Sequence, residues 1–90
     1  MEFEYRIVVI KSKREKKNCL HDEMLGRNCN VIHAGKNEVA VLAVEGLYAD
    51  GISEKVYTSP VVDIRKNVNV LVIETVNTVY VLEELEYDTE

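Results

Sequence analysis

Residues 68–85 read Val-Asn-Val-Leu-Val-Ile-Glu-Thr-Val-Asn-Thr-Val-Tyr-Val-Leu-Glu-Glu-Leu, and they give the strongest indication of the fold class. Most of its apolar residues are branched at Cβ, which costs rotamer freedom in a helix and suits a pleated sheet. The pair Val76-Asn77 interrupts the run, and Asn77 is the residue there that best tolerates a left-handed backbone. The stretch therefore predicts a β-hairpin with strands over 68–75 and 78–85.

Further extended segments precede this hairpin. Gly35-Lys36-Asn37 predicts a tight turn between two of them, and Arg65-Lys66-Asn67 predicts a short turn before the hairpin. Pro60 lies inside another segment, and because proline cannot donate to a ladder we expect that strand to bend, bulge or lie at an edge. The expected strands span residues 2–10, 27–34, 38–45 and 52–64.

The composition of the whole chain also favours β-strands. Its 90 residues include 15 Val and 6 Ile against 7 Leu and 4 Ala, which favours sheet over helix. A chain of this length has room for one hydrophobic core, so we expect a single domain over residues 1–90. Residues 18–26 show no clean period and are expected to form a connector with one helical turn. Six short strands predict an all-β fold, a small antiparallel barrel of the SH3-like or OB-like kind without a long helix.

Charge is distributed unevenly along the chain. The net charge is −5, yet residues 11–17 carry five basic groups and one acidic group, whereas residues 83–90 are acidic. Clustered cations on a loop can contact phosphates, although no aromatic residue for stacking is interleaved with them. The alternative is a solvated loop tip whose charge discourages edge pairing. We call residues 11–17 the basic run, and its candidate binding residues are Lys11, Lys13, Arg14, Lys16 and Lys17.

Targeting signals are not evident. No stretch approaches the roughly 20 apolar residues that span a bilayer, and the N-terminus lacks the pattern of a signal peptide. We therefore expect a cytoplasmic protein with no membrane partner. Two cysteines are too few for a disulfide scaffold, and in a reducing compartment we expect them as thiols.

All cysteines and histidines of the chain lie within 15 residues, at Cys19, His21, Cys29 and His33. Two thiolates and two imidazoles could complete a closed, tetrahedral zinc shell, which would make the protein a zinc-stabilised, nucleic-acid-associated domain. Against this, neither pair has the spacing of a zinc knuckle. The favoured interpretation is that Cys29 is a small buried apolar residue, that Cys19 and His21 lie in a solvated loop, and that the protein needs no cofactor.

Catalysis has little support in the sequence. It contains no glycine-rich phosphate cradle, no Gly-x-Ser-x-Gly elbow and no pair of histidine ligands one helical turn apart. A Cys–His dyad could be drawn from residues 19–33, and it keeps a small hydrolase as a distant alternative. We expect a protein that is not an enzyme.

Several segments are apolar on both strand faces, which predicts self-association. Residues 39–44 and 70–73 contain no polar side chain, and in 79–82 only the Tyr80 hydroxyl is polar. A monomeric barrel covers only the inward half of such strands. We expect a homo-oligomer, most simply a dimer, through the outer face of the C-terminal hairpin. The alternative is that the connector or the acidic tail folds over that face.

Residues 57–82 carry a recognisable pattern, in which Thr58-Ser59-Pro60-Val61 is followed by residues 74–82, Glu-Thr-Val-Asn-Thr-Val-Tyr-Val-Leu. It resembles short uncharacterised proteins of bacteria, phages and other mobile elements, roughly T-S-P-V, then E-T-x-N-[ST]-x-Y-x-L. The resemblance implies a shared fold and an accessory role, such as an inhibitor or ligand-sequestering protein acting against host defence. Together with the residues, it predicts a non-enzymatic binding module whose partner is a protein or a phosphate-bearing ligand.

Overall fold

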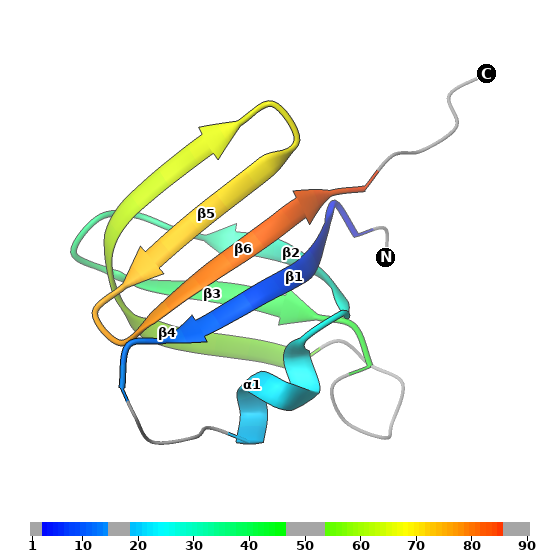
Figure 1. Cartoon of the computed structure of the whole chain (residues 1–90), viewed down its shortest axis with the longest axis horizontal. Coiled ribbons are helices and arrows are strands. Elements are labelled where there is room, and N and C mark those ends of the chain that lie inside the picture. The colour runs from blue at the N-terminus through cyan, green and yellow to red at the C-terminus, as the bar shows by residue number, and fades with distance from the viewer. Residues whose placement is uncertain (1–2, 15–18, 47–53, 86–90) are drawn as a thin grey trace.

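The computed structural model describes residues 3–14, 19–46 and 54–85, and it shows an all-β fold (Figure 1). Six antiparallel strands follow one another in chain order, and β1 pairs with β6 as well as β2, so the sheet closes into a barrel. The predicted barrel without a long helix is confirmed. The elements are β1 (Tyr5–Ser12), α1 (Cys19–Met24), β2 (Asn28–His33), β3 (Val39–Val44), β4 (Glu54–Asn67), β5 (Val70–Thr75) and β6 (Thr78–Glu84).

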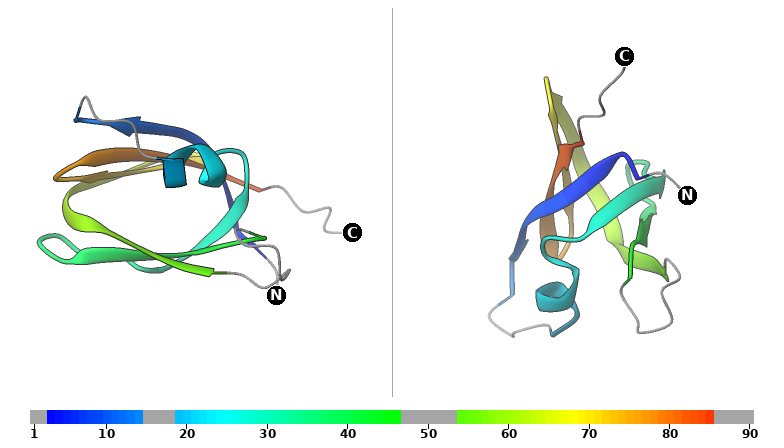
Figure 2. Two further views of the ribbon diagram at one scale, coloured as in Figure 1. Left: turned by 90° about the horizontal axis from the view of Figure 1, so that it is seen from below. Right: turned by 90° about the vertical axis from the view of Figure 1, so that its right-hand side faces the viewer.

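The barrel is flattened into two layers with α1 at one end (Figure 2). β1, β6 and β5 lie side by side in one layer, and β3 with the first part of β4 forms the other. The core between the layers is apolar, and α1 adds the fully buried Met24 to it. Its other fully buried apolar side chains are those of Ile7, Cys29, Ala40, Leu42, Val44, Val61, Ile73 and Leu82.

The connector after β1 forms α1, a short helix that is tied back to β1. Gly26 follows the helix with a φ of 85°, a left-handed conformation that glycine adopts without a Cβ clash. Its N–H donates to the carbonyl of Ile7 (2.7 Å), and the Ile7 N–H donates to the carbonyl of Arg27 (2.9 Å). These bonds hold α1 over the barrel end. No helix in the described part of the chain is long and apolar enough to cross a membrane.

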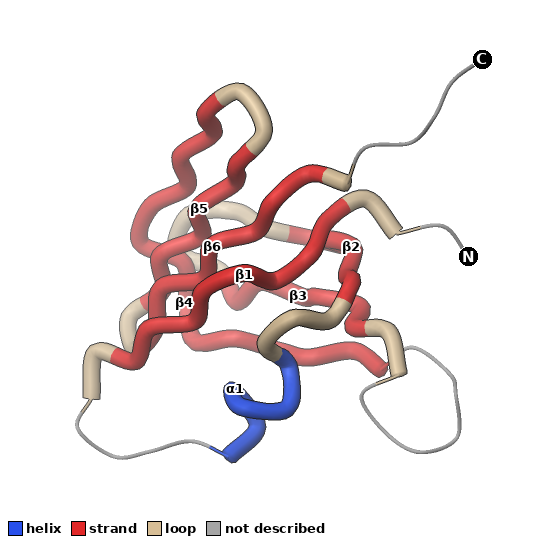
Figure 3. The backbone as a smooth tube through the Cα atoms, turned by 45° about the vertical axis from the view of Figure 1, so that its right-hand side comes forward, coloured by secondary structure: helices blue, strands red, loops and turns tan. Residues whose placement is uncertain are grey.

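β4 is one long strand that serves both layers (Figure 3). It pairs first with β3 and then with β5, and the register shifts on both sides of Pro60, between Tyr57 and Pro60 and between Val61 and Asp63. These bulges let the strand bend from one layer into the other, at the point where proline cannot donate to a ladder. The irregularity expected at Pro60 is confirmed.

Two turns differ from the sequence-based expectation. Residues 65–67 are not a turn, because β4 continues to Asn67, which pairs with Val70, and the chain reverses at Val68 and Asn69. Arg65 and Lys66 are tolerated in the strand because this hairpin leaves their side chains exposed. Among the described non-glycine residues only Asn37 has a positive φ (70°), so Asn77 is not left-handed.

The turn around Asn77 is held by a side chain instead. Thr75 Oγ1 accepts a hydrogen bond from the Thr78 N–H (3.0 Å) and donates one to the Thr78 carbonyl (2.9 Å). Thr75 is fully buried, so these bonds are shielded from water. The hydroxyl closes the hairpin without the left-handed residue that a two-residue primed turn requires.

Candidate functional site

A small pocket lies where α1 meets the barrel end. Its volume is about 150 Å³, close to that of five water molecules. One helix and two strands contribute its walls, and the turn before β6 contributes its rim. The lining residues are Leu20, His21 and Met24 of α1, Val56, Tyr57, Thr58 and Ser59 of β4, and Asn77, Thr78 and Tyr80 at β6.

Two aromatic rings shape the inner part of this α1 pocket. His21 and Tyr80 meet edge to face with ring centroids 6.0 Å apart. Burial lowers the pKa of His21, with a smaller opposing effect from Asp22, so the neutral imidazole is favoured. Burial also raises the pKa of Tyr80, opposed by a hydrogen bond with Thr78, so the phenol is neutral near pH 7. The inner wall therefore presents uncharged aromatic groups.

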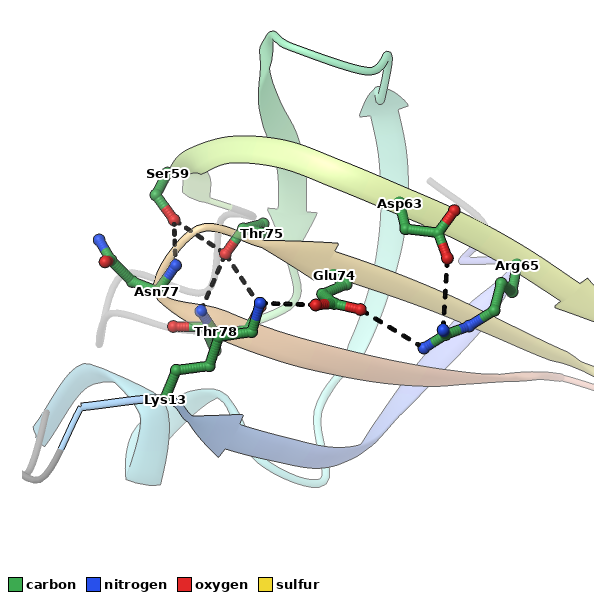
Figure 4. Close-up of polar contacts among 8 residues, drawn as sticks. All are labelled: Lys13, Ser59, Asp63, Arg65, Glu74, Thr75, Asn77 and Thr78. Carbon is green, nitrogen blue, oxygen red and sulfur yellow. Dashed lines mark hydrogen bonds and ion pairs between the residues drawn. The ribbon is translucent and has the colours of Figure 1, made fainter.

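A network of hydroxyl groups holds the rim in place (Figure 4). The Ser59 hydroxyl donates to Thr75 Oγ1 (2.8 Å) and accepts from the Asn77 N–H (3.1 Å). On the other side of the pocket, Thr58 Oγ1 accepts from the buried Ala40 N–H (3.0 Å). β4 is thereby fixed to the β5–β6 turn and to β3, so the pocket exists without a ligand to organise it.

Two side chains of the rim are available to a ligand. Tyr57 is 66% exposed although it is large and aromatic, because it lies on the outer side of β4 between the buried residues Val56 and Thr58. The Asn77 side-chain amide makes no hydrogen bond within the described residues, whereas its backbone is engaged on both sides. An exposed aromatic face and an amide with both donor and acceptor atoms suit a planar, polar group.

The basic run passes this rim at Lys13. The Lys13 N–H donates to the Asn77 carbonyl (2.8 Å), which brings the end of β1 against the pocket. Arg14 follows in a turn in which its N–H donates to Ser12 Oγ (3.2 Å). Lys11 lies on the outer face of β1 opposite Val79, away from the pocket. Lys16 and Lys17 lie outside the described residues.

The Lys13 side chain points instead into a chain of charges on the outer face (Figure 4). Its Nζ lies 2.6 Å from Glu74 Oε2, and the other oxygen of Glu74 lies 3.7 Å from Arg65, which in turn contacts Asp63 at 3.3 Å. The guanidinium of Arg14 has no ion-pair partner in the part of the chain that the structure describes. Of the two cations beside the Asn77 turn, Arg14 is therefore the one whose charge is not neutralised within the described chain.

The zinc tetrad does not form. Cys19 is exposed, His21 lines the α1 pocket, and burial raises the pKa of the Cys29 thiol to about 12, which opposes the thiolate that zinc requires. His33 pairs with Glu38 on the surface, because a bulge at Ile32 breaks the alternation that would set it on the face of Cys29. No three Cys, His, Asp or Glu side chains among residues 3–14, 19–46 and 54–85 form a metal site.

Sequence reasoning missed the site at Tyr57, Asn77 and His21, which lie far apart along the chain. The signal that could have found it was the T-S-P-V and E-T-x-N-T pattern, whose Ser59, Thr75 and Asn77 meet in one network. No protein-family model, curated protein or solved structure matches the chain. The site is therefore judged on its own geometry.

Proposed function

We propose that the protein is a non-enzymatic binding module that holds a small phosphate-bearing ligand at the α1 pocket. The planar part of the ligand lies against Tyr57 with its polar edge toward the Asn77 amide, and its phosphates lie outside, at the basic run. The observation that carries the proposal is the bond between the Lys13 N–H and the Asn77 carbonyl, because it sets a cationic segment beside an aromatic, polar hollow.

The dimensions favour a mononucleotide or dinucleotide as this ligand. A hollow of about 150 Å³ has room for a single planar ring system, so sugar and phosphates must project past the rim. Phosphates there lie beside the segment of Lys13 and Arg14, and the clustered cations of the basic run supply a salt-dependent attraction. Stacking on an aromatic ring is the usual way in which proteins hold an unpaired base.

The proposal of binding without catalysis agrees with the state of two hydroxyl groups and one thiol group of the barrel. The Ser59 and Thr75 hydroxyls are occupied by hydrogen bonds that stabilise the turn, and the Cys29 thiol is buried and protonated. Within the cell we propose that the module acts in the cytoplasm by sequestering its ligand. The resemblance of residues 57–82 to mobile-element proteins supports such an accessory role, directed against host defence.

Isothermal titration with nucleoside monophosphates and cyclic dinucleotides at 50 and 200 mM salt tests the proposal. We expect binding that weakens with salt and weakens at least tenfold when Lys13, Arg14, Lys16 and Lys17 are all replaced by Gln. The matched control replaces Arg6, Lys36, Arg65 and Lys66 by Gln, which changes the net charge equally away from the pocket, and it should bind within about twofold of wild type.

The planar half of the site has its own test. Tyr57→Ala and Asn77→Ala should each weaken nucleotide binding roughly fivefold to a hundredfold while leaving the salt dependence unchanged. Unchanged affinity in the quadruple basic variant, or preference for an oligonucleotide over every small nucleotide, contradicts the proposal. Tyr57→Phe is the control for stacking, because it keeps the ring.

A further inference from the structure

The outer face of β1, β6, β5 and the second part of β4 forms a continuous surface that no described element covers. Ladder pairing places Val9, Val81, Val72 and Arg65 in one row across the four strands. These side chains point outward, because their neighbours Ile10, Tyr80, Ile73 and Ile64 pack in the core. α1 covers the barrel end and leaves this face open (Figure 2).

The rows on either side give this face an apolar centre and a charged border. One neighbouring row contains Lys11, Val79, Glu74 and Asp63, and the other contains Arg6, Glu83, Val70 and Asn67. Val9 is 46% exposed, and the other valines of the face are half-buried by their neighbours. We call this surface the valine face, and its apolar members are Val9, Val70, Val72, Val79 and Val81.

We propose that the valine face is the interface of a symmetric homodimer, with the two-fold axis parallel to the strands and between β5 and β6. Each row then faces the same row of the partner with the strand order reversed, so that β6 lies on the partner's β5 and β1 lies on the partner's β4. Val81 then packs on the partner's Val72, and Lys11 faces the partner's Asp63. By symmetry both contacts occur twice, as an isologous interface requires.

Charge selects this axis over the other one available to two stacked faces. A two-fold axis running across the strands exchanges the two border rows, and it places Lys11 against the partner's Arg6 and Glu83 against the partner's Val79. Both axes set carboxylates on valines, since the parallel axis places Glu74 on the partner's Val79, so the like charges make the difference. The axis across the strands also sets Arg65 against the partner's Arg65, and these two contacts between like charges disfavour it. The parallel axis instead pairs opposite charges at the rim, which is the usual anatomy of an interface with an apolar centre.

The area is sufficient for a reversible dimer. Four strands about 4.8 Å apart and six residues at about 3.3 Å each give a face of roughly 19 by 20 Å. Because side chains protrude from the sheet, the accessible area exceeds that of a flat rectangle, and two such faces bury on the order of 1,000 Å² in total. This is the lower limit for a specific interface. We therefore expect dissociation in the micromolar range.

Light scattering coupled to size exclusion, from about 1 to 200 µM, tests the assembly. The apparent mass should rise from 10.3 kDa toward twice that value. Val72→Glu should remain monomeric throughout, with a dissociation constant raised at least a hundredfold. Ile32→Glu is the matched control, because Ile32 is 52% exposed on β2, outside the valine face, and it should dimerise as wild type does.

The orientation is tested by exchanging the facing charges. Lys11→Glu should weaken the dimer severalfold, and adding Asp63→Lys should restore it. If Val72→Glu unfolds by circular dichroism, Val81→Lys takes its place. A wild-type mass of 10.3 kDa at the highest concentration, or dimerisation by a folded Val72→Glu protein, overturns the interface. Failure of the exchange to rescue overturns the orientation.

Discussion

Both faces of the β5–β6 hairpin carry apolar residues, but the side chains differ in size between the two faces, and only the inner face is enclosed by the barrel. The inner face carries Ile73, Tyr80 and Leu82, which differ in size and shape and are buried. The outer face carries the valines 70, 72, 79 and 81, which are alike and half-buried. A closed interior selects side chains that fill an irregular space, whereas an open pleated surface needs only β-branched residues that fit the sheet. Hydrophobicity alone does not distinguish core from surface in such a strand, but variety of size does.

The largest expected effect separates two neighbours on β5. Ile73→Ala should lower the free energy of unfolding by about 2–5 kcal/mol, because it leaves a cavity in the core. Val72→Ala should cost less than about 1 kcal/mol when measured by urea unfolding near 1 µM, below the range of dimer formation. Equal costs at the two positions would remove the distinction between the faces.

A second effect concerns the polar member of the inner face. Thr75→Val keeps the shape but leaves the Thr78 N–H without its side-chain acceptor, so we expect a loss of about 1–3 kcal/mol in the free energy of unfolding. Hydrogen exchange at the Thr78 amide should accelerate in this variant. Thr75→Ser is the control, since it retains the hydroxyl and should preserve the protection of that amide. Wild-type stability in the valine variant would show that the hydroxyl does not hold the turn.

The outer-face counterpart is the ion pair between Lys13 and Glu74. Both side chains are partly exposed, and the pair lies in high dielectric despite its short distance. A double-mutant cycle with Lys13→Gln and Glu74→Gln should give a coupling of about 0.2–1 kcal/mol that decreases between 50 and 500 mM salt. At about 1 µM, below the range of dimer formation, a coupling several times larger and insensitive to salt would mean that another part of the chain covers this face.

The smallest expected effect is a pH dependence of the free energy of unfolding that arises from His21 in the α1 pocket. Burial lowers the pKa of His21 below its usual 6.5, so the unfolded chain binds a proton more readily than the folded protein. The contribution of His21 to stability is present above pH 6.5 and is lost as the pH falls through its folded-state pKa. Unfolding curves at several pH values should show this loss in wild type relative to His21→Gln. A difference that grows in the opposite direction would place the imidazole in a site that favours its charge.

Local chemistry in the sequence was enough for much of the architecture. Alternation and β-branching located the strands. Pro60 predicted the irregularity of β4, because a proline cannot donate a ladder hydrogen bond in any strand of the sheet. Turn chemistry was less reliable. Asn37 is left-handed as expected, but Asn77 is not, since a buried threonine hydroxyl from the same hairpin closes that turn instead.

Only the charged part of the candidate site could be predicted from the sequence. The basic run was visible as a cluster in sequence, but the aromatic group that the run lacks locally is supplied by Tyr57 from another strand. The predicted metal alternative failed for a related reason. A bulge at Ile32, which arises from pairing with β3, turns His33 away from Cys29, and no property of residues 28–33 alone specifies it.

From the residues alone it follows that this chain builds strands, where most of them lie, and that its C-terminal hairpin carries apolar residues on both faces. Which face of that hairpin packs in the core, and which residues meet at the α1 pocket, follows from the closed barrel and not from local sequence. The physical reason is register. Ladder hydrogen bonds join residues far apart in the chain, and each bulge, as at Val8 between Ile7 and Val9, exchanges the inward and outward sets beyond it. Those choices are made when the barrel closes, because only then does one register bury the large side chains together.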